Sequence, residues 1–390
     1  MNIGLFTDTY PPEINGVATS TEMLRKTFEL HGHNVYIVTT NPHSNKMEYK
    51  DRILRIPGIL LKKLYNYRLA GIFHPKATKI IKSWKLDVIH CQTEGGVGIY
   101  GRLLAPSLDV ALITTYHTMY VDYTYYVTKG LFDQSIKSLV KKLSKLLSKA
   151  CTEFTTPSVK TKDALRSYGV ERYINVIPNG IDLDKFERNE INEERIRKFR
   201  KDNNFEDTFI LLSLGRVAEE KAIDVLIDSY ASFLAKKPSK KTMLLIVGDG
   251  PSKANLEKQV HDLKIEENVM FIGKVPYDDV PFFYQLADLY VSASVTETQG
   301  LTFIEAIASK TLVLCRFDEN LSEVIKEKET GFYFSDNDTF ELKLNSILNM
   351  SEIEKEKIKI NAYKINRRYS LDAFYENMLE VYKRAIRKRW

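Results

Sequence analysis

Short apolar runs alternate with longer amphipathic stretches along most of this 390-residue chain. Near the start, an apolar run at residues 3–7 is followed by a loop rich in Pro and Gly at residues 11–16, an amphipathic stretch through Leu30 and a second apolar run at residues 35–39. Strands that alternate with helices are typical of parallel sheets, because two parallel strands need a long crossover connection. The pattern therefore predicts an α/β fold.

The same alternation restarts after the Pro-Asn-Gly turn at residues 178–180. The further apolar runs that we expect to form strands are residues 87–90, 111–114, 154–156, 209–214, 243–247, 269–272, 289–292 and 312–314. We therefore predict two Rossmann-like domains, residues 1–177 and 178–370, and a basic C-terminal helix at residues 371–390 that packs across both. Ligands bind beyond the carboxyl ends of parallel strands, so two such domains facing across a cleft place the site in their loops.

The composition narrows the class of protein. With 44% hydrophobic residues the chain can form packed cores, but no run approaches the roughly 18 apolar residues of a membrane-spanning helix, and the first residues lack the basic segment of a secretion signal. The three cysteines, Cys91, Cys151 and Cys315, lack the paired spacing of a zinc site or a disulfide framework. We therefore expect a protein of the reducing cytoplasm that is neither integral to a membrane nor secreted.

The charge is unevenly distributed along the chain. The net charge is +6, and residues 1–180 contain 24 Lys and Arg against 14 Asp and Glu, whereas the rest contains 33 against 37. A positive field favours an anionic partner, which is a phosphate-bearing ligand, a membrane surface or a nucleic acid. Composition alone leaves all three open.

A first cluster of candidate residues follows the expected strand at residues 209–214. In the sequence Gly-Arg-Val-Ala-Glu-Glu-Lys, Arg216 and Lys221 precede an amphipathic stretch that begins near Ile223. A helix N-terminus favours an anion, and the two cations add a forked donor and a point charge that suit a diphosphate. The alternative is a solvated loop with two ordinary surface cations.

A second cluster combines two acids eight positions apart, Glu297 and Glu305, with a glycine-bearing turn between them. Ionised carboxylates accept hydrogen bonds from sugar hydroxyls, so such a pair can hold two hydroxylated parts of one ligand. Backbone N–H groups at the start of the following helix, around Gly300, Leu301 and Thr302, are expected to point at phosphates. Taken alone, the pair is better explained by an exposed helix surface, but together with the Arg/Lys loop it favours a site for a ligand that carries both hydroxyls and phosphates.

These motifs resemble those of the retaining nucleotide-sugar glycosyltransferases of family 4, which have the GT-B fold, and the resemblance covers essentially the whole chain. It rests on the Glu-x7-Glu and Gly-Arg-x4-Lys spacings, on the glycine loop at Gly16 and on the Tyr-His-Thr segment at residues 116–118. Many relatives have two glycines where this chain has Asn15 and Gly16, so the approach of backbone to phosphate is less secure at that turn.

The resemblance implies a role for each candidate residue. Glu297 would hold the transferred hexose, and His117 would project towards the reacting sugar as an orienting donor or sugar contact; these two are the expected catalytic residues. As a lone histidine beside a strand, His117 would otherwise be explained as a structural residue. The residues that the resemblance assigns to the donor are Gly16, Arg216, Lys221, Gly300, Leu301, Thr302 and Glu305, with Glu305 on the ribose.

The expected chemistry requires neither a metal nor a cofactor. Cations and helix amides that meet the charge of a departing nucleoside diphosphate accelerate its departure. Two Asp-x-Asp strings, at residues 182–184 and 336–338, are interpreted as turn and cap residues. The resemblance implies that the acceptor attacks on the face from which the diphosphate leaves, without a covalent glycosyl-enzyme.

A Gly-x-Gly-x-x-Gly string at residues 96–101 matches the fingerprint of dinucleotide-binding dehydrogenases. Such a fingerprint is expected in the first strand–helix turn and is followed about 20 residues later by an acid. Here it lies in the middle of the first domain, and Ile113, Thr114 and Thr115 stand in place of that acid. We therefore expect no nicotinamide cofactor.

The acceptor is expected to bind the basic first domain, where two segments have the composition of membrane contacts. Residues 136–149 combine a helical stripe of aliphatic residues with five lysines, and residues 59–68 mix aliphatic, basic and aromatic side chains. The alternative for residues 136–149 is a helix packed on the core with a wet basic face, and both interpretations can hold together.

Three further segments, residues 6–12, 90–95 and 115–123, look like those of the diacylglycerol glucosyltransferases of low-GC Gram-positive bacteria and mollicutes. This resemblance implies transfer of glucose from UDP-glucose to diacylglycerol at the inner face of the cell membrane. The alternatives are a family 4 enzyme with another acceptor, a sugar-nucleotide-binding protein without catalysis, and a nucleic-acid-binding protein, although the sequence contains no recognisable nucleic-acid-reading module.

Overall fold

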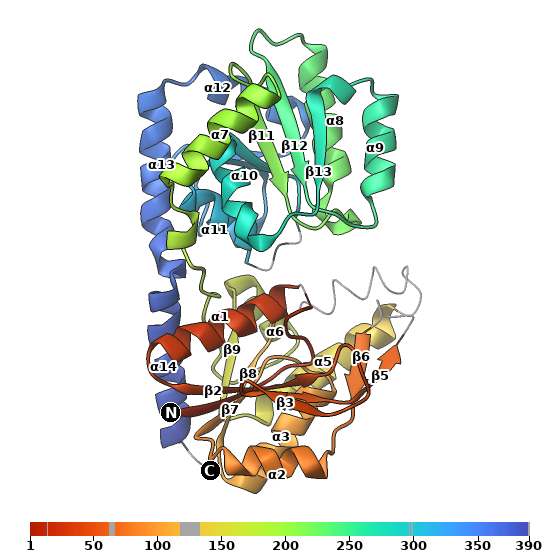
Figure 1. Ribbon diagram of the computed structural model, residues 1–390, viewed down its shortest axis with the longest axis vertical. Coiled ribbons are helices and arrows are strands. Elements are labelled where there is room, and N and C mark those ends of the chain that lie inside the picture. Colours follow the sequence, from red (N-terminus) through yellow and green to blue (C-terminus); the bar gives the residue numbers. More distant parts are fainter. Residues whose placement is uncertain (14, 62–66, 118–132, 296, 298, 389–390) are drawn as a thin grey trace. The chain divides into compact units, whose positions relative to one another are not determined.

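The computed structural model describes every residue of the chain other than 14, 62–66, 118–132, 296, 298 and 389–390. The chain forms two compact units, one made of Met1–Gly180 with Leu371–Trp390 and the other of Ile181–Ser370. The first unit thus extends three residues beyond the predicted boundary and includes the C-terminal helix. Each unit is an α/β layer structure with its own sheet (Figure 1).

The sheet of the first unit has the strand order β10-β9-β8-β7-β1-β2-β4-β3. Its pairs are parallel except for the β3–β4 pair, which is antiparallel. The strands are β1 (Asn2–Phe6), β2 (Asn34–Thr40), β3 (Glu48–Lys50), β4 (Ile53–Ile56), β7 (Val88–Cys91), β8 (Ala111–Thr115), β9 (Glu153–Thr156) and β10 (Asn175–Val176). The order reverses between β1 and β7, and such a switch point is where open α/β sheets bind ligands.

Helices cover both faces of this sheet (Figure 1). They are α1 (Gly16–Leu30), α2 (Pro75–Ser83), α3 (Gly96–Leu108), α5 (Asp133–Lys149), α6 (Val159–Ser167) and α14 (Leu371–Arg387). Successive side chains of a strand enter opposite cores, as Leu5 and Phe6 of β1 do. Both faces of the central strands β1, β7 and β8 are therefore buried, which explains why these strands read as continuous apolar runs.

The C-terminal helix α14 packs on the first unit. Phe28 of α1 lies with its ring centroid 5.0 Å from that of Tyr382. At the end of the helix, Arg384 Nε and Lys388 Nζ each lie 2.9 Å from Glu153 Oε1 on β9. These hydrogen bonds hold the pKa of the Glu153 carboxyl at about 2, although burial acts to raise it. The apolar face of α14 is thus buried, and the basic side chains at its end form ion pairs with the buried Glu153.

The segment that was expected at a membrane interface forms an antiparallel hairpin of β5 (Gly58–Leu61) and β6 (Tyr67–Ala70). Ile59 lies opposite Leu69, and both side chains are exposed. The connecting residues 62–66 lie outside the described part of the chain. Among the described helices, none is both long and apolar enough to cross a membrane.

The second unit contains a parallel sheet with the strand order β13-β12-β11-β14-β15-β16. The strands are β11 (Phe209–Leu214), β12 (Thr242–Val247), β13 (Val269–Gly273), β14 (Leu289–Ser292), β15 (Leu312–Arg316) and β16 (Phe332–Phe334). The helices are α7 (Glu190–Asp202), α8 (Ile223–Ala235), α9 (Lys253–Asp262), α10 (Val280–Leu286), α11 (Leu301–Ala308), α12 (Asn337–Asn349) and α13 (Glu352–Asn366). This is the Rossmann strand order, with its switch point between β11 and β14.

The glycines at residues 96–101 have a packing role. A Cβ on Gly96 would lie 1.9 Å from the carbonyl oxygen of Ala70, and one on Gly98 would lie 1.9 Å from that of Thr93. Real side chains do not approach a backbone oxygen that closely, so α3 can sit against β6 and the loop after β7 only with glycine at these positions. The dinucleotide-binding interpretation is therefore not needed to explain this string.

Candidate active site

A pocket opens at the switch point of the second unit, between the loops that follow β11 and β14. Its lining residues are Ser213, Leu214, Gly215, Arg216, Lys221, Ile223, Tyr290, Ser292, Glu297 and Thr302. Arg216 and Lys221 come from the loop after β11, Glu297 from the loop after β14 and Thr302 from the first turn of α11. Residues far apart in the sequence, which the motifs had grouped by chemistry alone, thus meet in one place.

Charged groups of both signs face each other in this pocket. Lys221 Nζ lies 2.6 Å from Glu297 Oε1, and Arg216 Nη1 lies 3.4 Å from Glu220 Oε1. The Glu297 side chain is 11% exposed and that of Lys221 is 31% exposed, so the pair is sheltered but open on one side. A phosphate group that enters the pocket meets two cations, and a sugar that enters it meets one carboxylate.

Two helices begin at the pocket without a side-chain cap. Ala222, before α8, and Gly300, before α11, both have left-handed backbone conformations and supply no side-chain acceptor for the first N–H groups. At α12, by contrast, Asp336 accepts from the backbone N–H of Thr339 in a capping box. Because uncapped N-termini offer free donors and a positive dipole end, α8 and α11 both favour an anion at this pocket.

Glu305 lies one turn further along α11 and is not among the described residues that line the pocket. Its carboxylate accepts hydrogen bonds from the hydroxyls of Tyr284, at 2.9 Å, and Tyr277, at 3.4 Å. Burial raises the pKa of Glu305 to about 7, although both hydrogen bonds act to lower it. The two acids of the Glu-x7-Glu motif therefore have different surroundings, one paired with a cation and the other with two phenols.

In the first unit, the candidate His117 follows the end of β8. Its Nε2 lies 2.7 Å from Oε1 of Gln92, which follows the end of the neighbouring strand β7. Burial lowers the pKa of His117 to about 4, so the ring is neutral at pH 7. The remainder of the Tyr-His-Thr motif and of the similar segment at residues 115–123 lies outside the described part of the chain from residue 118 onwards.

Gly16 is the first residue of α1. Asn15 caps the helix by accepting from the backbone N–H of Ala18 at 2.9 Å. Gly16 is exposed, and a Cβ added there would have no atom within 4 Å. The packing of the first unit therefore does not require glycine at this position.

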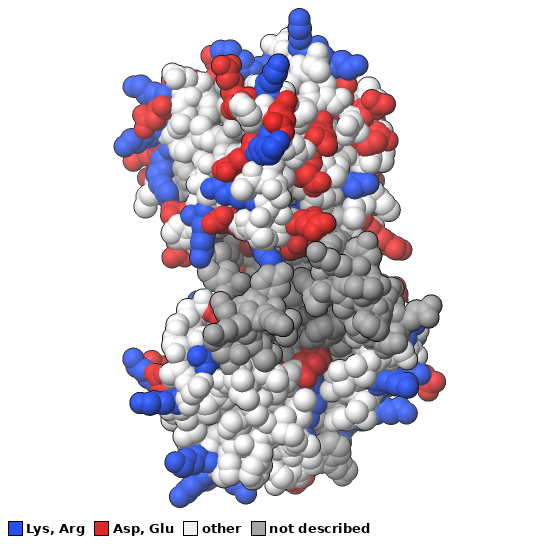
Figure 2. Space-filling model, turned by 90° about the vertical axis from the view of Figure 1, so that its right-hand side faces the viewer, with Lys and Arg blue, Asp and Glu red and all other residues white. Residues whose placement is uncertain are grey.

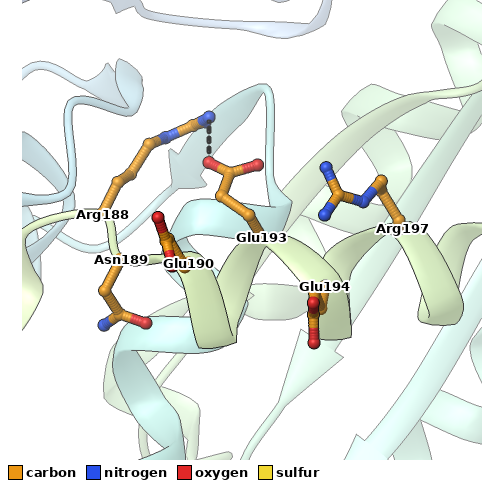
Figure 3. A pocket seen from close by; sticks show the side chains of 6 residues that line it. All are labelled: Arg188, Asn189, Glu190, Glu193, Glu194 and Arg197. Atoms are coloured by element: carbon orange, nitrogen blue, oxygen red, sulfur yellow. Dashed lines mark hydrogen bonds and ion pairs between the residues drawn. The ribbon is translucent and has the colours of Figure 1, made fainter.

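A different hollow lies at the start of α7 (Figure 3) and is lined by Arg188, Asn189, Glu190, Glu193, Glu194 and Arg197. Arg188 Nη1 forms an ion pair with Glu193 Oε1 at 3.0 Å, and Asn189 caps the helix by accepting from the backbone N–H of Asn192. The described residues that line this hollow all belong to the start of α7 or directly precede it, and none ends a strand, so it is a weaker candidate for a nucleotide site than the switch-point pocket.

The Asp-x-Asp strings have the structural roles that the sequence predicts. Asp336 is the N-cap of α12, and Asp182 accepts from the backbone N–H of Lys185 at 3.4 Å. Within the described residues, no group of three or more His, Cys, Asp and Glu side chains is placed to hold a metal ion.

Some residues of the site were not predicted from the sequence. Ser213 and Ser292 line the pocket, and their position at the carboxyl ends of β11 and β14 was a usable signal. Asp318 follows the end of β15 and accepts from the backbone N–H of Glu297 at 3.2 Å. Nothing in the sequence pairs these two residues, which are 21 positions apart. The tyrosines around Glu305 likewise come from separate elements, η4 (Tyr277–Asp279) and α10.

Comparison with known proteins assigns the chain to a class. Residues 14–185 match the family described as Glycosyltransferase Family 4, and residues 194–365 match the family described as Glycosyl transferases group 1. Two named relatives also match over most of the chain, so the chain belongs to glycosyltransferase family 4. It is a glycosyltransferase with the predicted GT-B fold.

The similarity to these relatives is extensive. The alpha-monoglucosyldiacylglycerol synthase of Streptococcus pneumoniae is 36% identical over 389 residues, which cover 99% of this chain and 86% of that protein. The enzyme of the same name from Acholeplasma laidlawii is 32% identical over 344 residues, which cover 87% of this chain and 86% of that protein. This family resemblance is the one that the sequence motifs predicted.

Solved structures show the same fold at lower sequence identity. Anabaena HepE in complex with UDP has a TM-score of 0.74 and 17% identity, covering 98% of this chain and 100% of that chain. The sucrose-phosphate synthase of Thermosynechococcus elongatus has a TM-score of 0.75 and 18% identity, covering 98% of each chain.

Proposed function

We propose that this protein transfers glucose from UDP-glucose to the free hydroxyl of diacylglycerol, with retention of the anomeric configuration. The observation that carries the donor part is the meeting of Arg216, Lys221 and Glu297 in one pocket at the switch point of the second unit. The acceptor part is supported by the two alpha-monoglucosyldiacylglycerol synthases that match most of the chain.

The charges of the pocket suit the departure of a nucleoside diphosphate. The bond between C1 of the sugar and the diphosphate oxygen breaks, and C1 forms a bond to the acceptor oxygen on the same face of the sugar. The proton of the acceptor hydroxyl passes to the departing diphosphate. Arg216, Lys221 and the free N–H groups of α8 and α11 would meet the new negative charge, which stabilises the transition state. A diphosphate that draws Lys221 away from Glu297 would leave that carboxylate to accept from the sugar hydroxyls.

We assign the remaining donor contacts as the family resemblance implies. The amides at Gly16 would approach the diphosphate, as would those of Gly300, Leu301 and Thr302 at the start of α11. Glu305 would accept hydrogen bonds from the ribose hydroxyls, and His117 would contact the transferred hexose.

The Glu305 assignment predicts a pH dependence of donor binding. Because burial raises the pKa of Glu305 to about 7, its carboxyl changes from mostly neutral to mostly ionised between pH 6 and pH 8. The ionised carboxylate accepts hydrogen bonds through both oxygens, whereas the neutral form keeps a proton on one of them. The ionised fraction falls to about a tenth at pH 6, so the Kd of UDP-glucose should rise about tenfold between pH 8 and pH 6. UDP-glucose suits this titration calorimetry because its diphosphate does not ionise further in this range.

Glu305→Gln is the matched control for that titration, because glutamine has no carboxyl to ionise. The Kd of the variant should be higher than that of the wild type at pH 8 and should change little down to pH 6. The same pH dependence in wild type and variant would remove Glu305 from the donor site.

The surface of α5 supports binding to an anionic membrane. Leu139, Leu143 and Leu146 form one exposed row along the helix, and Lys141, Lys142, Lys145 and Lys149 are exposed beside it. The buried face of the described part of α5 consists instead of Ser144, Leu147 and Ser148. The interpretation of the stripe as core packing therefore holds for Leu147 but not for the exposed row.

Four further exposed apolar side chains of the first unit lie in and after the β5–β6 hairpin, namely Ile59, Leu69, Ile72 and Phe73. On the face drawn in Figure 2, Lys and Arg side chains of the first unit lie mainly along its edges, whereas in the second unit the two signs of charge are interspersed. Apolar side chains flanked by cations suit the interface of an anionic bilayer. We therefore propose a peripheral location at the inner face of the cell membrane.

This surface predicts a loss of vesicle binding on substitution. Replacing Leu139, Leu143 and Leu146 together by glutamine should weaken binding to anionic vesicles about 100-fold, because each leucine that enters the interface contributes roughly 1 kcal/mol or more. Vesicle sedimentation measures this. The control is Leu342→Gln on α12, which removes an equally exposed leucine from the second unit. Equal binding by both variants would show that α5 does not contact the membrane.

The proposed reaction is tested by incubating the purified protein with UDP-glucose and anionic vesicles that contain diacylglycerol. We expect a glucosyl lipid with an α linkage, and no product when diacylglycerol is omitted. If no glycolipid forms while another lipid, a polysaccharide or a soluble acceptor is glycosylated, the acceptor assignment is wrong. If UDP-glucose binds but no acceptor is glycosylated, the assignment of a transfer reaction is wrong.

A further inference from the structure

We propose that Gln92 is a positioning residue, which holds the ring of His117 in the tautomer that carries its proton on Nε2 and so keeps Nδ1 as a hydrogen-bond acceptor for a hydroxyl of the transferred sugar. The sugar contact rests on the proposed function. The tautomer itself does not, because it follows from the contacts within the first unit.

The two residues are brought together by neighbouring strands. Gln92 follows β7 and His117 follows β8, and Cys91 at the end of β7 is paired with Thr114 near the end of β8. The backbone N–H of Gln92 donates to the carbonyl of Phe6 at 2.8 Å, so β1 and β7 fix the start of its side chain. Gln92 is 2% exposed. Its side chain therefore approaches His117 from a rigid and buried position.

The identity of the contacting atoms determines the tautomer. His117 Nε2 lies 2.7 Å from Oε1 of Gln92. A carboxamide oxygen accepts hydrogen bonds and cannot donate them, so Nε2 must carry a proton. Burial keeps the pKa of His117 low, so the ring carries no second proton at neutral pH. Nδ1 is then a lone-pair acceptor.

The other end of the carboxamide is unused. Nε2 of Gln92 is buried and has no hydrogen-bond partner among the described residues. A buried amide donor without a partner costs about 1–3 kcal/mol, and such groups are rare in folded proteins unless a ligand or water completes them. Because this nitrogen is buried, Nδ1 of His117 is the atom of the pair that we assign to a sugar hydroxyl, which can donate to it.

His90 provides the contrast within the same sheet. It is fully buried on β7, and both of its ring nitrogens are engaged, Nδ1 with the hydroxyl of Tyr382 at 2.8 Å and Nε2 with Thr115 Oγ1 at 2.6 Å. His117 has Gln92 as its single hydrogen-bond partner among the described residues. A histidine with both nitrogens used stabilises the fold, whereas one with a nitrogen left over can bind a ligand.

The tautomer is tested by 15N NMR of the full-length protein labelled at histidine. Wild-type His117 should show the chemical shifts of the Nε2-protonated tautomer, and Gln92→Leu should shift them towards a mixture of both tautomers. Gln92→Glu keeps an accepting oxygen and should keep the proton on Nε2, so this variant tests the contact if the leucine variant fails to fold. A wild-type ring protonated on Nδ1, or unchanged shifts in a folded Gln92→Leu protein, would overturn the proposal.

The matched control is Gln285→Leu on α10, a glutamine that is also 2% exposed and that donates to the carbonyls of Phe186 and Glu187 in the second unit. It removes the same kind of side chain from an equally buried place without touching His117. Its His117 signals should equal those of the wild type. If this variant also shifted them, the effect of Gln92→Leu would reflect general destabilisation and the positioning role would be lost.

Kinetics test the link to the sugar. Gln92→Leu should lower kcat for glucosyl transfer about tenfold with little change in the KM of UDP-glucose, because orientation of His117 matters most in the transition state. A rise in KM with unchanged kcat would contradict this. If the wild-type protein transfers no sugar, the proposed function fails, and the sugar contact of His117 falls with it. The NMR measurement still decides whether Gln92 sets the tautomer.

Discussion

Replacing Glu297 by alanine should lower kcat for sugar transfer by roughly 10²–10³-fold while UDP remains bound, as for the loss of one group aimed at the reacting centre. Glu297 is the one carboxylate that lines the described part of the pocket, and its proposed contact is with the hexose, which UDP lacks. The substitution also releases Lys221 from its 2.6 Å ion pair, so the affinity for a diphosphate should not fall.

Two measurements separate these effects, namely initial rates at saturating UDP-glucose and calorimetric titration with UDP. The control is Glu219→Ala, which removes an exposed acid from the loop that carries Lys221 and should leave the rate unchanged. An equal loss of UDP binding and of transfer in the Glu297 variant would contradict the sugar contact, because it would place Glu297 on the nucleotide or in the fold itself.

The first unit should lose about 4 kcal/mol of its free energy of unfolding between pH 7.5 and pH 5. Burial lowers the pKa of His90 to about 3 and that of His117 to about 4, whereas both rings titrate near 6.5 when unfolded. Unfolding below pH 6.5 therefore takes up protons, and stability falls as the pH falls. Glu153, with a pKa of about 2, acts in the same direction but only below about pH 4.5.

Urea unfolding followed by the fluorescence of Trp84 measures this, because Trp84 is buried in the first unit. The other tryptophan, Trp390, lies outside the described residues. His117→Gln should remove about half of the pH dependence, since one of the two histidines can no longer take up a proton. The exposed His43→Gln variant should keep all of it. A free energy of unfolding that is the same at pH 7.5 and pH 5 would show that the two rings are not neutral in the fold.

The second unit should respond to pH with the opposite sign. The pKa of Glu305 is raised to about 7 from about 4.5, so this carboxyl stabilises the fold below pH 4.5 and that contribution is lost as the pH rises through 7. Glu305→Gln should therefore make the second unit more resistant to unfolding at pH 8 relative to the wild type. Hydrogen exchange of the amides in β14 and β15 reports on that unit, and equal protection in both proteins would contradict the raised pKa.

The strands that bear the site could be predicted because each is buried on both faces. A run such as residues 209–214 is apolar at nearly every position, which identifies a central parallel strand without tertiary information. The loops after such strands then contain the site by topology, so Arg216, Lys221 and Glu297 could be grouped from the sequence alone. Strands with exposed faces, such as β3 and β5, have no such signal and were not predicted.

Pairs formed across the fold could not be predicted. Nothing in the local sequence links Gln92 to His117, or Tyr284 to Glu305, because each pair depends on which strands and helices become neighbours. The sequence of α14 likewise indicated a helix with a basic end, and we expected it to pack across both domains, whereas the helix groups with the first unit. The exposed leucine row of α5 shows the same limit, since periodicity identifies a stripe and tertiary packing decides whether the stripe is covered.

A crystal structure of the protein with UDP-glucose would show whether the switch-point pocket of the second unit binds the activated sugar. We predict diphosphate oxygens within hydrogen-bond distance of Arg216 and Lys221, and hexose hydroxyls on the carboxylate of Glu297. A nucleotide bound elsewhere, for instance in the hollow at the start of α7, with Lys221 still paired to Glu297, would show that the switch-point pocket is not the donor site.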